Sequence, residues 1–554
     1  MNTRQNKNAM ALYLGSFIGM AKAIKVSDKP QPFLRSAAWH LPGVSALVLS
    51  QFTLEYFLGW EAVRFLVAWV ALKPQKLDLN RRMGWSILHL YPYGLGTLAF
   101  LFWRVFIFQF PTYQPVGTDA SEFVLHEWVL RIIGQFFDIV FAAWGRAFPP
   151  LSSGEFSQAF WLTTLAISAG AMVMVFVALA LYRNNRQETG ESLTSPKNKF
   201  GGQALLIGLV GLVFAGWPFW LTDLNINIRS PFLSRFTMAF MPWVALFFTA
   251  FLHWFSRNRS GFIRVLNLAL IALLVGGSVG YHIWNTNFYR NEWQITQRYF
   301  QQMVRRIPDL EPGTTLVVND LRSLSLNQDD SLSAIFNWTY APENTDKEMD
   351  YVVHYLSVRL GLQLPALTPG LPIEHQFRSQ VFYGTTDQLL VVYYRPPGCL
   401  RVLDNAHPDR LPEEFPLALA FALPLSKPEL IRINSEEHAT PPLHLFDEPK
   451  IETWCLYFED ADLAAQQGDW ERVAALGDRA LELEDQSNEV SELFVFIEGY
   501  LRVGRLDKAE ALSETLSQRS GRYYDGAICG LWQEVEGDLD QTVDFGPVYE
   551  RFCD

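Results

Sequence analysis

Seven charged residues lie inside or beside long apolar segments in the first half of the chain. They are Glu55, Glu61, Arg64, Arg104, Asp223, Arg229 and Arg235. An ionisable group at membrane depth is costly, and such groups commonly mark a site for protons, ions or substrate. A carboxylate there can act as a general base, and arginine forks bind phosphate through paired N–H donors. We therefore take these seven residues as the candidate functional set.

Spacing separates the two glutamates. Glu61 and Arg64 lie three residues apart, on one face of a helix, so they can neutralise each other as a structural ion pair. Glu55 has no such partner nearby in the sequence and is the candidate general base, with Glu61 as the alternative catalytic carboxylate. Arg104 lies deep within the segment LAFLFWRVFIF, where a carboxylate or a lipid phosphate would relieve the cost of its charge.

The loop TDLNINIRSPFLSR brings Asp223, Arg229 and Arg235 together. With Arg64 and Arg104, these residues are the candidate substrate-binding set for a phosphate or pyrophosphate group. Extension of long side chains to the membrane surface explains Arg229 and Arg235 equally well.

Common catalytic motifs are missing from the sequence. It contains no P-loop, no HExxH and no metal-type cluster of cysteine and histidine. No cofactor is identified, and no residue pattern supports a divalent metal. GGSVG, from Gly276 to Gly280, matches a nucleophile elbow in letters only, because it lies in an apolar segment. We expect these glycines, like Gly15 and Gly19, to let helices pack closely.

The elements that would position these residues are membrane spans. Convincing apolar segments of about 20 residues lie near 84–108, 158–182, 201–221, 234–255 and 262–284. The stretch 37–72 reads as a hairpin of two short helices that turns between Glu55 and Glu61, and Met10–Ala23 reads as a further short span. The prediction is a polytopic α-helical membrane protein of about seven to eight spans, with residues 1–284 as its membrane domain.

The distribution of charge predicts the sides of the membrane. Residues 1–284 carry a net charge of +11 and the remainder −23, within a total of −12. Lysine and arginine cluster in the loops 22–35, 73–82, 183–199 and 257–264, which is typical of cytoplasmic loops. Everything after Trp284 is then external, and its acidity excludes nucleic acid as a partner. Met1 also falls outside. Either the first segment, Met10–Ala23, lies in the interface, or relatives carry further helices before it, and we expect the second.

One external segment is itself apolar. The sequence WVLRIIGQFFDIVFAAW, Trp128–Trp144, predicts an interfacial helix along the outer leaflet. A short helix packed on the external domain is the alternative.

The soluble half divides into two predicted domains, a mixed α/β domain over 285–450 and a helical domain over 451–554. The first begins with a helix, Glu292–Arg306, and contains strands at Thr314–Asp320, Asp387–Arg395 and Leu430–Asn434. In the second, Gly468 and Gly504 begin two similar stretches 36 residues apart, close to the tetratricopeptide period of about 34. A pair of such repeats, packed on the α/β domain, is the prediction; a plain helical cap is the alternative.

All four cysteines, Cys399, Cys455, Cys529 and Cys553, lie after Trp284, in the compartment where disulfides can persist. A bond between Cys455 and Cys529 and free buried thiols are the two alternatives.

Several segments resemble a known group of proteins. EYFLGWEAVR, WPFWLTDL with the following RSPFLSRF, PPGCLRVLD and WCLYFEDADLAAQQGDWERVAALGD are similar to segments of uncharacterised bacterial multi-pass membrane proteins with a C-terminal external domain. In outline this group resembles GT-C glycosyltransferases, and the tetratricopeptide-like part resembles that of transmembrane O-mannosyltransferases. No residue carries over by motif, because the acidic loop after the first span of GT-C enzymes has no counterpart before residue 36.

The resemblance implies a protein of the bacterial plasma membrane with its C-terminal half outside the cytoplasm. It also implies transfer of a sugar from a polyprenyl-phosphate donor, in contact with membrane lipid. The rival hypothesis is a non-enzymatic, membrane-anchored scaffold that binds a partner protein through 451–554. A transporter or sensor is the third alternative.

Overall fold

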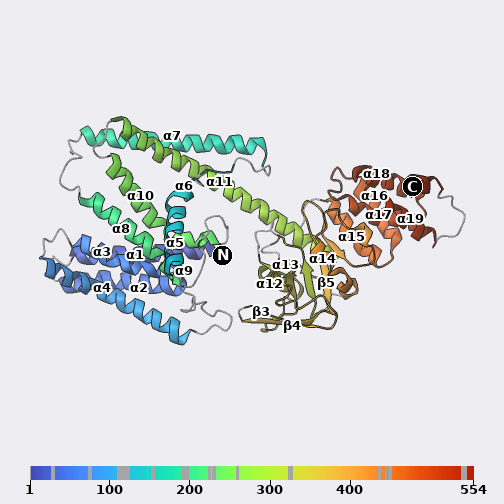
Figure 1. Ribbon diagram of the computed structural model, residues 1–554, viewed down its shortest axis with the longest axis horizontal. Coiled ribbons are helices and arrows are strands. Elements are labelled where there is room, and N and C mark those ends of the chain that lie inside the picture. Colours follow the sequence, from blue (N-terminus) through green and yellow to red (C-terminus); the bar gives the residue numbers. More distant parts are fainter. Residues whose placement is uncertain are drawn as a thin grey trace. The chain divides into compact units, whose positions relative to one another are not determined.

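The chain folds into two compact units (Figure 1), unit 1 over Met1–Thr286 and unit 2 over Asn287–Asp554, in a computed structural model. The structure describes residues 2–26, 32–72, 78–108, 125–145, 148–150, 156–188, 199–221, 226, 233–256, 261–321, 328–377, 379–433, 438–442, 446, 452–537 and 546–553. Asp223 and Arg229 lie outside the described residues.

Unit 1 is helical. Its elements are α1 (Asn2–Val26), α2 (Pro32–Thr53), η1 (Glu55–Trp60), α3 (Glu61–Ala71), α4 (Leu79–Phe102), η3 (Trp103–Ile107), α5 (Leu125–Phe137), η4 (Asp138–Ala142), α6 (Ala143–Gly145), α7 (Gln158–Glu188), α8 (Lys199–Ala215), α9 (Trp217–Leu221), η6 (Leu233–Ala239), α10 (Met241–Ser256) and α11 (Gly261–Arg306).

Five helices among the described residues are long and apolar enough to cross a membrane, which confirms a membrane-embedded protein. They are Lys7–Val26, Leu79–Ile107, Gln158–Asn184, Gly201–Trp220 and Gly261–Arg306. The predicted span 234–255 is shorter than expected, because α10 begins only at Met241. Pro242 has no N–H to donate to a preceding turn, so it sits in the first turn of this helix.

Glycines bring the helices of unit 1 into close contact, as expected. A Cβ added to Gly19 of α1 would lie 2.9 Å from Gly43 Cα of α2. One added to Gly276 of α11 would lie 2.7 Å from the carbonyl oxygen of Ser168 on α7. The expectation for Gly15 is wrong, since nothing lies within 4 Å of that position.

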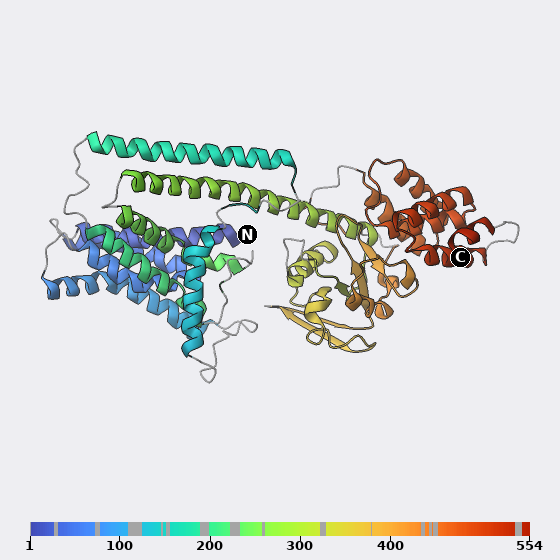
Figure 2. The same cartoon turned by 45° about the horizontal axis from the view of Figure 1, so that its top comes forward.

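The apolar helix predicted at Trp128–Trp144 is present as α5, η4 and α6, and its position along the outer leaflet stays a prediction. Figure 2 shows this cyan segment running across the direction of α7 and of the first part of α11. Its Trp144 stacks on Phe248 of α10 with ring centroids 4.6 Å apart, and Trp220 Nε1 donates to Gln135 Oε1 at 2.5 Å. A helix that crosses the spans fits a position along a membrane surface.

The helix predicted at Glu292–Arg306 is not separate from the preceding span. It is the last part of α11, a single helix of 46 residues that begins in unit 1 and ends in unit 2. In unit 2 its buried residues Tyr299, Phe300 and Met303 join the core on one side of the sheet. No residue between the span and this amphipathic part breaks the helix, because neither glycine nor proline occurs between Gly280 and Arg306.

Unit 2 opens with a small mixed sheet in the order β2-β1-β5-β6, flanked by a separate β3–β4 hairpin. The strands are β1 (Thr315–Val318), β2 (Val352–Tyr355), β3 (Pro372–Phe377), β4 (Gln380–Thr385), β5 (Leu389–Tyr393) and β6 (Arg401–Leu403). β1 pairs with β2 and β5 in parallel, starting at Thr315↔Val352 and Thr315↔Leu389, and β6 is antiparallel to β5. The predicted strands Thr314–Asp320 and Asp387–Arg395 are confirmed as β1 and β5.

The third predicted strand, Leu430–Asn434, is wrong. Pro428–Leu430 form a 3-10 turn, η9, and Ile431 makes only a single bridge with Leu310. The N–H groups of Leu430 and Ile431 donate to Lys427 and Pro428, so they are used inside the turn and not in a ladder. Asn434 lies outside the described residues.

Short helices surround the sheet, and a helical segment follows it. The helices are α12 (Asp329–Tyr340), α13 (Leu356–Arg359), η7 (Pro408–Arg410), α14 (Leu417–Ala420), η8 (Leu423–Leu425), η9 (Pro428–Leu430), α15 (Trp454–Gln466), α16 (Trp470–Leu481), η10 (Val490–Glu492), α17 (Leu493–Arg502), α18 (Leu506–Arg519), α19 (Asp525–Glu536) and α20 (Gly546–Phe552). The hydrophobic cores of unit 2 consist of its own residues.

The helical segment contains two successive helix pairs, α15 with α16 and α17 with α18. Gly468 and Gly504 lie in the two turns with φ of 72° and 74°, a backbone conformation that favours glycine. That these pairs are tetratricopeptide repeats stays a prediction. The segment packs on the α/β part, as expected: Arg410 pairs with Glu498 at 3.1 Å and Tyr524 donates to the carbonyl of Leu411 at 2.7 Å.

Both expectations for the cysteines are wrong. Cys399 is bonded to Cys455, and Cys529 to Cys553, which leaves no free thiol. The loop after β5 carries Cys399 against the start of α15, where Cys455 lies. The nearest partner of Cys529 on α19 is then Cys553, which follows α20, because α20 packs on α19.

A buried carboxylate joins the same two parts of unit 2. Glu492, at the end of η10, accepts hydrogen bonds from Cys399 N–H at 2.7 Å, Trp454 Nε1–H at 2.8 Å and Ser487 Oγ–H at 3.1 Å. Burial raises the pKa of Glu492 from 4.5 to about 7, against the lowering effect of these donors. Burial, followed by the charge of Asp462, also raises the pKa of Glu459.

We expect the stability of unit 2 to fall as the pH rises through about 7. A carboxyl with a raised folded-state pKa binds a proton that the unfolded chain has released, so its contribution is complete below pH 4.5 and lost above 7. For Glu492 this amounts to about 3 kcal/mol. Denaturant unfolding of residues 287–554 at pH 4.5 and pH 8 measures it, and Glu492→Gln should flatten the dependence. Equal slopes for both proteins would contradict the assignment to Glu492.

Candidate functional site

Glu55 and Glu61 lie at the two ends of one short turn. Glu55 begins η1 and Glu61 begins α3, so each carboxylate stands in the first turn of its helix, where negative charge is favoured. The indole of Trp60 donates to the carbonyl of Ala239 at 2.8 Å. Gly59 lies directly against the backbone of Phe214 on α8. The residues between the glutamates therefore fix this turn to the neighbouring elements.

Glu55 is paired with a distant residue. Arg104 Nε donates to Glu55 Oε2 at 3.0 Å, and the guanidinium lies 5.0 Å from the ring of Phe108. The Glu55 side chain is 45% exposed and the Arg104 side chain is 21% exposed, so this pair is neither sealed in packing nor fully open. The sequence predicted that Glu55 has no charge partner close to it along the chain. The structure gives it a distant one, because Arg104 lies 49 residues away in the sequence. Of the two partners expected for Arg104, the structure has the carboxylate.

Glu61 and Arg64 form the predicted ion pair in a buried environment. Arg64 Nε donates to Glu61 Oε2 at 2.8 Å and Arg64 Nη2 to Glu61 Oε1 at 2.7 Å. Tyr13 of α1 also donates to Glu61 Oε1 at 2.7 Å, and Arg64 Nη2 donates to Ser16 Oγ at 2.8 Å. The Arg64 side chain is fully buried. Both oxygens of Glu61 are thus engaged, whereas Glu55 has Arg104 as its charge partner among the described residues.

Sequence reasoning missed two histidines that extend this arrangement. The Arg64 guanidinium lies 4.4 Å from the ring of Tyr93, whose hydroxyl is 3.4 Å from His40 Nδ1. His40 Nε2 is in turn 2.9 Å from His89 Nδ1. We call Tyr13, Ser16, His40, Glu61, Arg64, His89 and Tyr93 the buried polar network. It draws on all four helices α1 to α4.

A signal for the network was present in the sequence. Ser86, His89, Tyr93 and Thr97 follow one another at intervals of three and four residues, which places them on one face of α4. The first three are buried. A polar face within an apolar helix predicts a polar neighbour, but it does not identify which helix supplies it.

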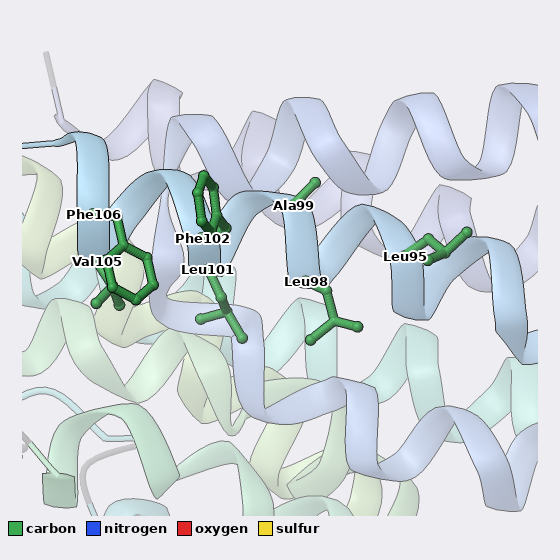
Figure 3. A pocket seen from close by; sticks show the side chains of 7 residues that line it. All are labelled: Leu95, Leu98, Ala99, Leu101, Phe102, Val105 and Phe106. Carbon is green, nitrogen blue, oxygen red and sulfur yellow. The ribbon is translucent and has the colours of Figure 1, made fainter.

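The opposite face of α4 carries an open apolar groove. Figure 3 shows its lining residues, Leu95, Leu98, Ala99, Leu101, Phe102, Val105 and Phe106, and its volume is about 590 Å³. Arg104 lies two helical turns after Thr97 and therefore on the polar face. Among the described residues, α4 and η3 line the groove, and neither Glu55 nor Arg104 is part of its lining.

Arg235 lies on η6, with its guanidinium 5.0 Å from the ring of Phe236. Phe236 in turn contacts Tyr56, the neighbour of Glu55, with ring centroids 5.1 Å apart. The structure therefore brings Arg235, Glu55, Glu61, Arg64 and Arg104 to neighbouring elements of unit 1.

Unit 2 holds a second buried cluster that the sequence did not suggest. Arg359 binds both oxygens of Asp329, at 2.6 and 2.7 Å, and His375 Nε2 contacts Asp330 Oδ1 at 2.8 Å. His354 Nε2 lies 3.2 Å from His375 Nδ1, and burial lowers the pKa of His354 to about 3, so it is neutral. These bonds join α12, α13, β2 and the β3–β4 hairpin, which indicates a structural role.

Within the described ranges, no group of three or more histidine, cysteine, aspartate or glutamate side chains is placed to hold a metal ion. Comparison of the chain with protein-family models, with curated proteins and with solved structures finds no match.

Proposed function

We propose that the chain is a membrane-embedded glycosyltransferase of the GT-C-like kind, which takes a sugar from a polyprenyl-phosphate donor. The observation that carries this proposal is the half-exposed pair of Glu55 and Arg104, beside the buried pair of Glu61 and Arg64. A partly exposed ion pair contributes only about 0–1 kcal/mol. A phosphate can therefore displace the carboxylate from Arg104 at small cost.

The displaced pair supplies the two groups that transfer needs. Arg104 binds the phosphate of the donor through its guanidinium N–H groups. Glu55, released but still close by, accepts the proton of the acceptor hydroxyl as its oxygen attacks the anomeric carbon of the sugar. The bond from that carbon to the phosphate oxygen breaks, and Arg104 stabilises the charge left on the phosphate. Glu61 and Arg64 remain paired and hold the turn in place.

Binding and transfer should respond differently to the two substitutions. In the full chain in lipid nanodiscs, Arg104→Gln should weaken binding of polyprenyl phosphate about 10- to 100-fold, because a hydrogen-bonded charge contributes about 1.5–3 kcal/mol. Glu55→Gln should bind at least as tightly, yet lower sugar transfer from a polyprenyl-phosphate monosaccharide by about 10²–10⁴. Arg183→Gln on α7 is the matched control for loss of one charge. Unchanged lipid binding by Arg104→Gln would overturn the proposal.

We further propose about seven to eight spans, formed by the five long helices together with the α2–α3 hairpin and α10, with unit 2 outside the cytoplasm. The basic loops support this orientation, and so do the two disulfides, which persist in oxidising compartments. A membrane-impermeant reagent applied to intact cells should therefore reach a tag placed behind Asp554. Labelling that requires permeabilised cells would contradict this orientation.

A further inference from the structure

The buried polar network runs along unit 1 from Glu61 towards the start of α4. Each step is short: Tyr13 Oη to Glu61 at 2.7 Å, Arg64 to the Tyr93 ring at 4.4 Å, Tyr93 Oη to His40 at 3.4 Å and His40 to His89 at 2.9 Å. Beyond His89, buried Ser86 lies one turn closer to the start of α4. Polar groups therefore follow one another over about two turns of α4, from Ser86 to Tyr93.

Three atoms in and beside this network have no hydrogen-bond partner among the residues that the structure describes. They are Gln51 Oε1, Arg64 Nη1 and His89 Nε2. Their side chains are 2%, 0% and 3% exposed, so none faces bulk solvent. They come from α2, α3 and α4, which are three of the four helices that form the network. Unpartnered atoms on three facing helices point to a shared cause.

Water is the partner that best fits these atoms. A buried polar group without a hydrogen bond costs several kcal/mol in hydrocarbon, and ordered water commonly supplies the missing bond in polar sites. The backbone leaves room for the polar groups: a Cβ at Gly43 would lie 2.4 Å from Tyr93 Oη. Glycine at this position thus allows the hydroxyl to reach the line between Arg64 and His40.

We propose that the buried polar network, with water at these three atoms, is a path for protons through unit 1. A proton accepted at one imidazole nitrogen of His40 or His89 is released from the other, and hydroxyl groups and water relay it further. Arg64 keeps its proton throughout, so transfer near it uses the Tyr13 hydroxyl, the Glu61 carboxylate and water. No other reactant is consumed, because the proton gradient alone supplies the driving force.

Proton flux tests the path directly. Proteoliposomes that contain the full chain, a trapped pH-sensitive dye and valinomycin with a potassium gradient should acidify or alkalinise faster than empty vesicles. His89→Gln and Tyr93→Phe keep similar volumes but interrupt transfer, so each should lower the flux at least tenfold. His282→Gln on α11 is the control for loss of a histidine outside the network. Thermal unfolding of each variant in detergent shows whether it has folded.

Cysteine accessibility tests the water without altering the histidines. All four native cysteines are in disulfides, so an introduced cysteine is the single free thiol. Ser86→Cys and Thr97→Cys lie on the polar face of α4, and Leu95→Cys and Leu98→Cys on its apolar face. Only a hydrated thiol ionises and reacts readily with a charged methanethiosulfonate, so the first pair should react and the second should not.

The outcomes are decisive in either direction. Flux that depends on His89 and Tyr93, with reaction confined to the polar face, supports the path. Flux no greater than that of empty vesicles, flux that the two substitutions leave unchanged, or equal reaction of all four cysteines overturns it. None of these measurements involves a lipid-phosphate sugar, so their failure leaves the transferase proposal untouched, and the reverse also holds.

Discussion

Glu61→Gln should lower the free energy of unfolding of the full chain by about 3–5 kcal/mol, because removing one partner of a buried ion pair leaves the other charge uncompensated. The remaining charge is that of Arg64, whose side chain is fully buried and receives no solvent. Its other contacts are Ser16 and the aromatic rings of Phe17, Tyr93 and Tyr13, at 4.2, 4.4 and 5.8 Å. These contacts orient the guanidinium but supply no full negative charge. Reversible unfolding in mixed detergent micelles measures the loss.

Two further variants separate charge from packing. Glu61→Gln combined with Arg64→Met removes both charges, so it should recover most of the stability that the single substitution loses. Glu55→Gln breaks the half-exposed pair with Arg104 and should cost no more than about 1 kcal/mol. If Glu55→Gln lowered the free energy of unfolding as much as Glu61→Gln does, burial would not decide how much an ion pair contributes here.

Among glycine-to-alanine substitutions in the described part of unit 1, Gly59→Ala should lower the free energy of unfolding most. A Cβ at this position would lie 1.8 Å from the carbonyl oxygen of Phe214. That atom belongs to the backbone of α8 and cannot rotate away, so η1 and α8 must separate. We expect a loss of about 3 kcal/mol, the upper end of the usual cost of overpacking. The proposed transferase activity should fall with it, because η1 lies between Glu55 and Glu61 and positions both.

Gly94→Ala is the matched control. Gly94 also lies in a membrane helix, α4, but nothing is within 4 Å of an added Cβ. Alanine there should be neutral or slightly stabilising, since it favours the helix more than glycine does. Thermal unfolding of the two variants side by side would show the difference. Similar unfolding midpoints would mean that α8 moves enough to accommodate the Cβ atom added at Gly59.

The membrane elements of unit 1 could be predicted because hydrophobic length is a local property. Most of the expected spans are confirmed within a few residues, and the turn between Glu55 and Glu61 is present as η1. The start of α10 could not be placed from hydrophobicity, because the apolar residues Phe236, Met238 and Ala239 of η6 lead directly into it. There the position of Pro242 was the better guide.

Of the candidate site, the sequence could supply the pair whose members are neighbours. Glu61 and Arg64 are three residues apart, and their geometry follows from helical spacing alone. The pair of Glu55 and Arg104 depends on how α4 packs beside α2, and the contact of His40 with His89 depends on the same packing. Such contacts arise from tertiary structure, so a single sequence indicates that a partner is needed without naming it.

In unit 2, the sequence did not predict which strands and which cysteines pair with each other. The strongly apolar strands β1 and β5 were evident, whereas β2, with the sequence VVHY, has only two aliphatic residues and gave too little signal. The disulfides were mispaired because chain separation does not reveal which helices pack together. Cys455 lies closer to Cys399 than to Cys529 for this reason: β6 and the loop before it pack against α15 and η10.

The bond between Cys529 and Cys553 closes a ring that contains residues 538–545. A protease that cuts once within this ring would change the apparent mass in a reducing gel but release nothing under non-reducing conditions. The last helix, α20, would therefore stay attached to α19 after cleavage. An epitope tag fused after Asp554 would remain bound to the rest of the protein. Only cleavage combined with a reductant would shed the carboxy-terminal peptide.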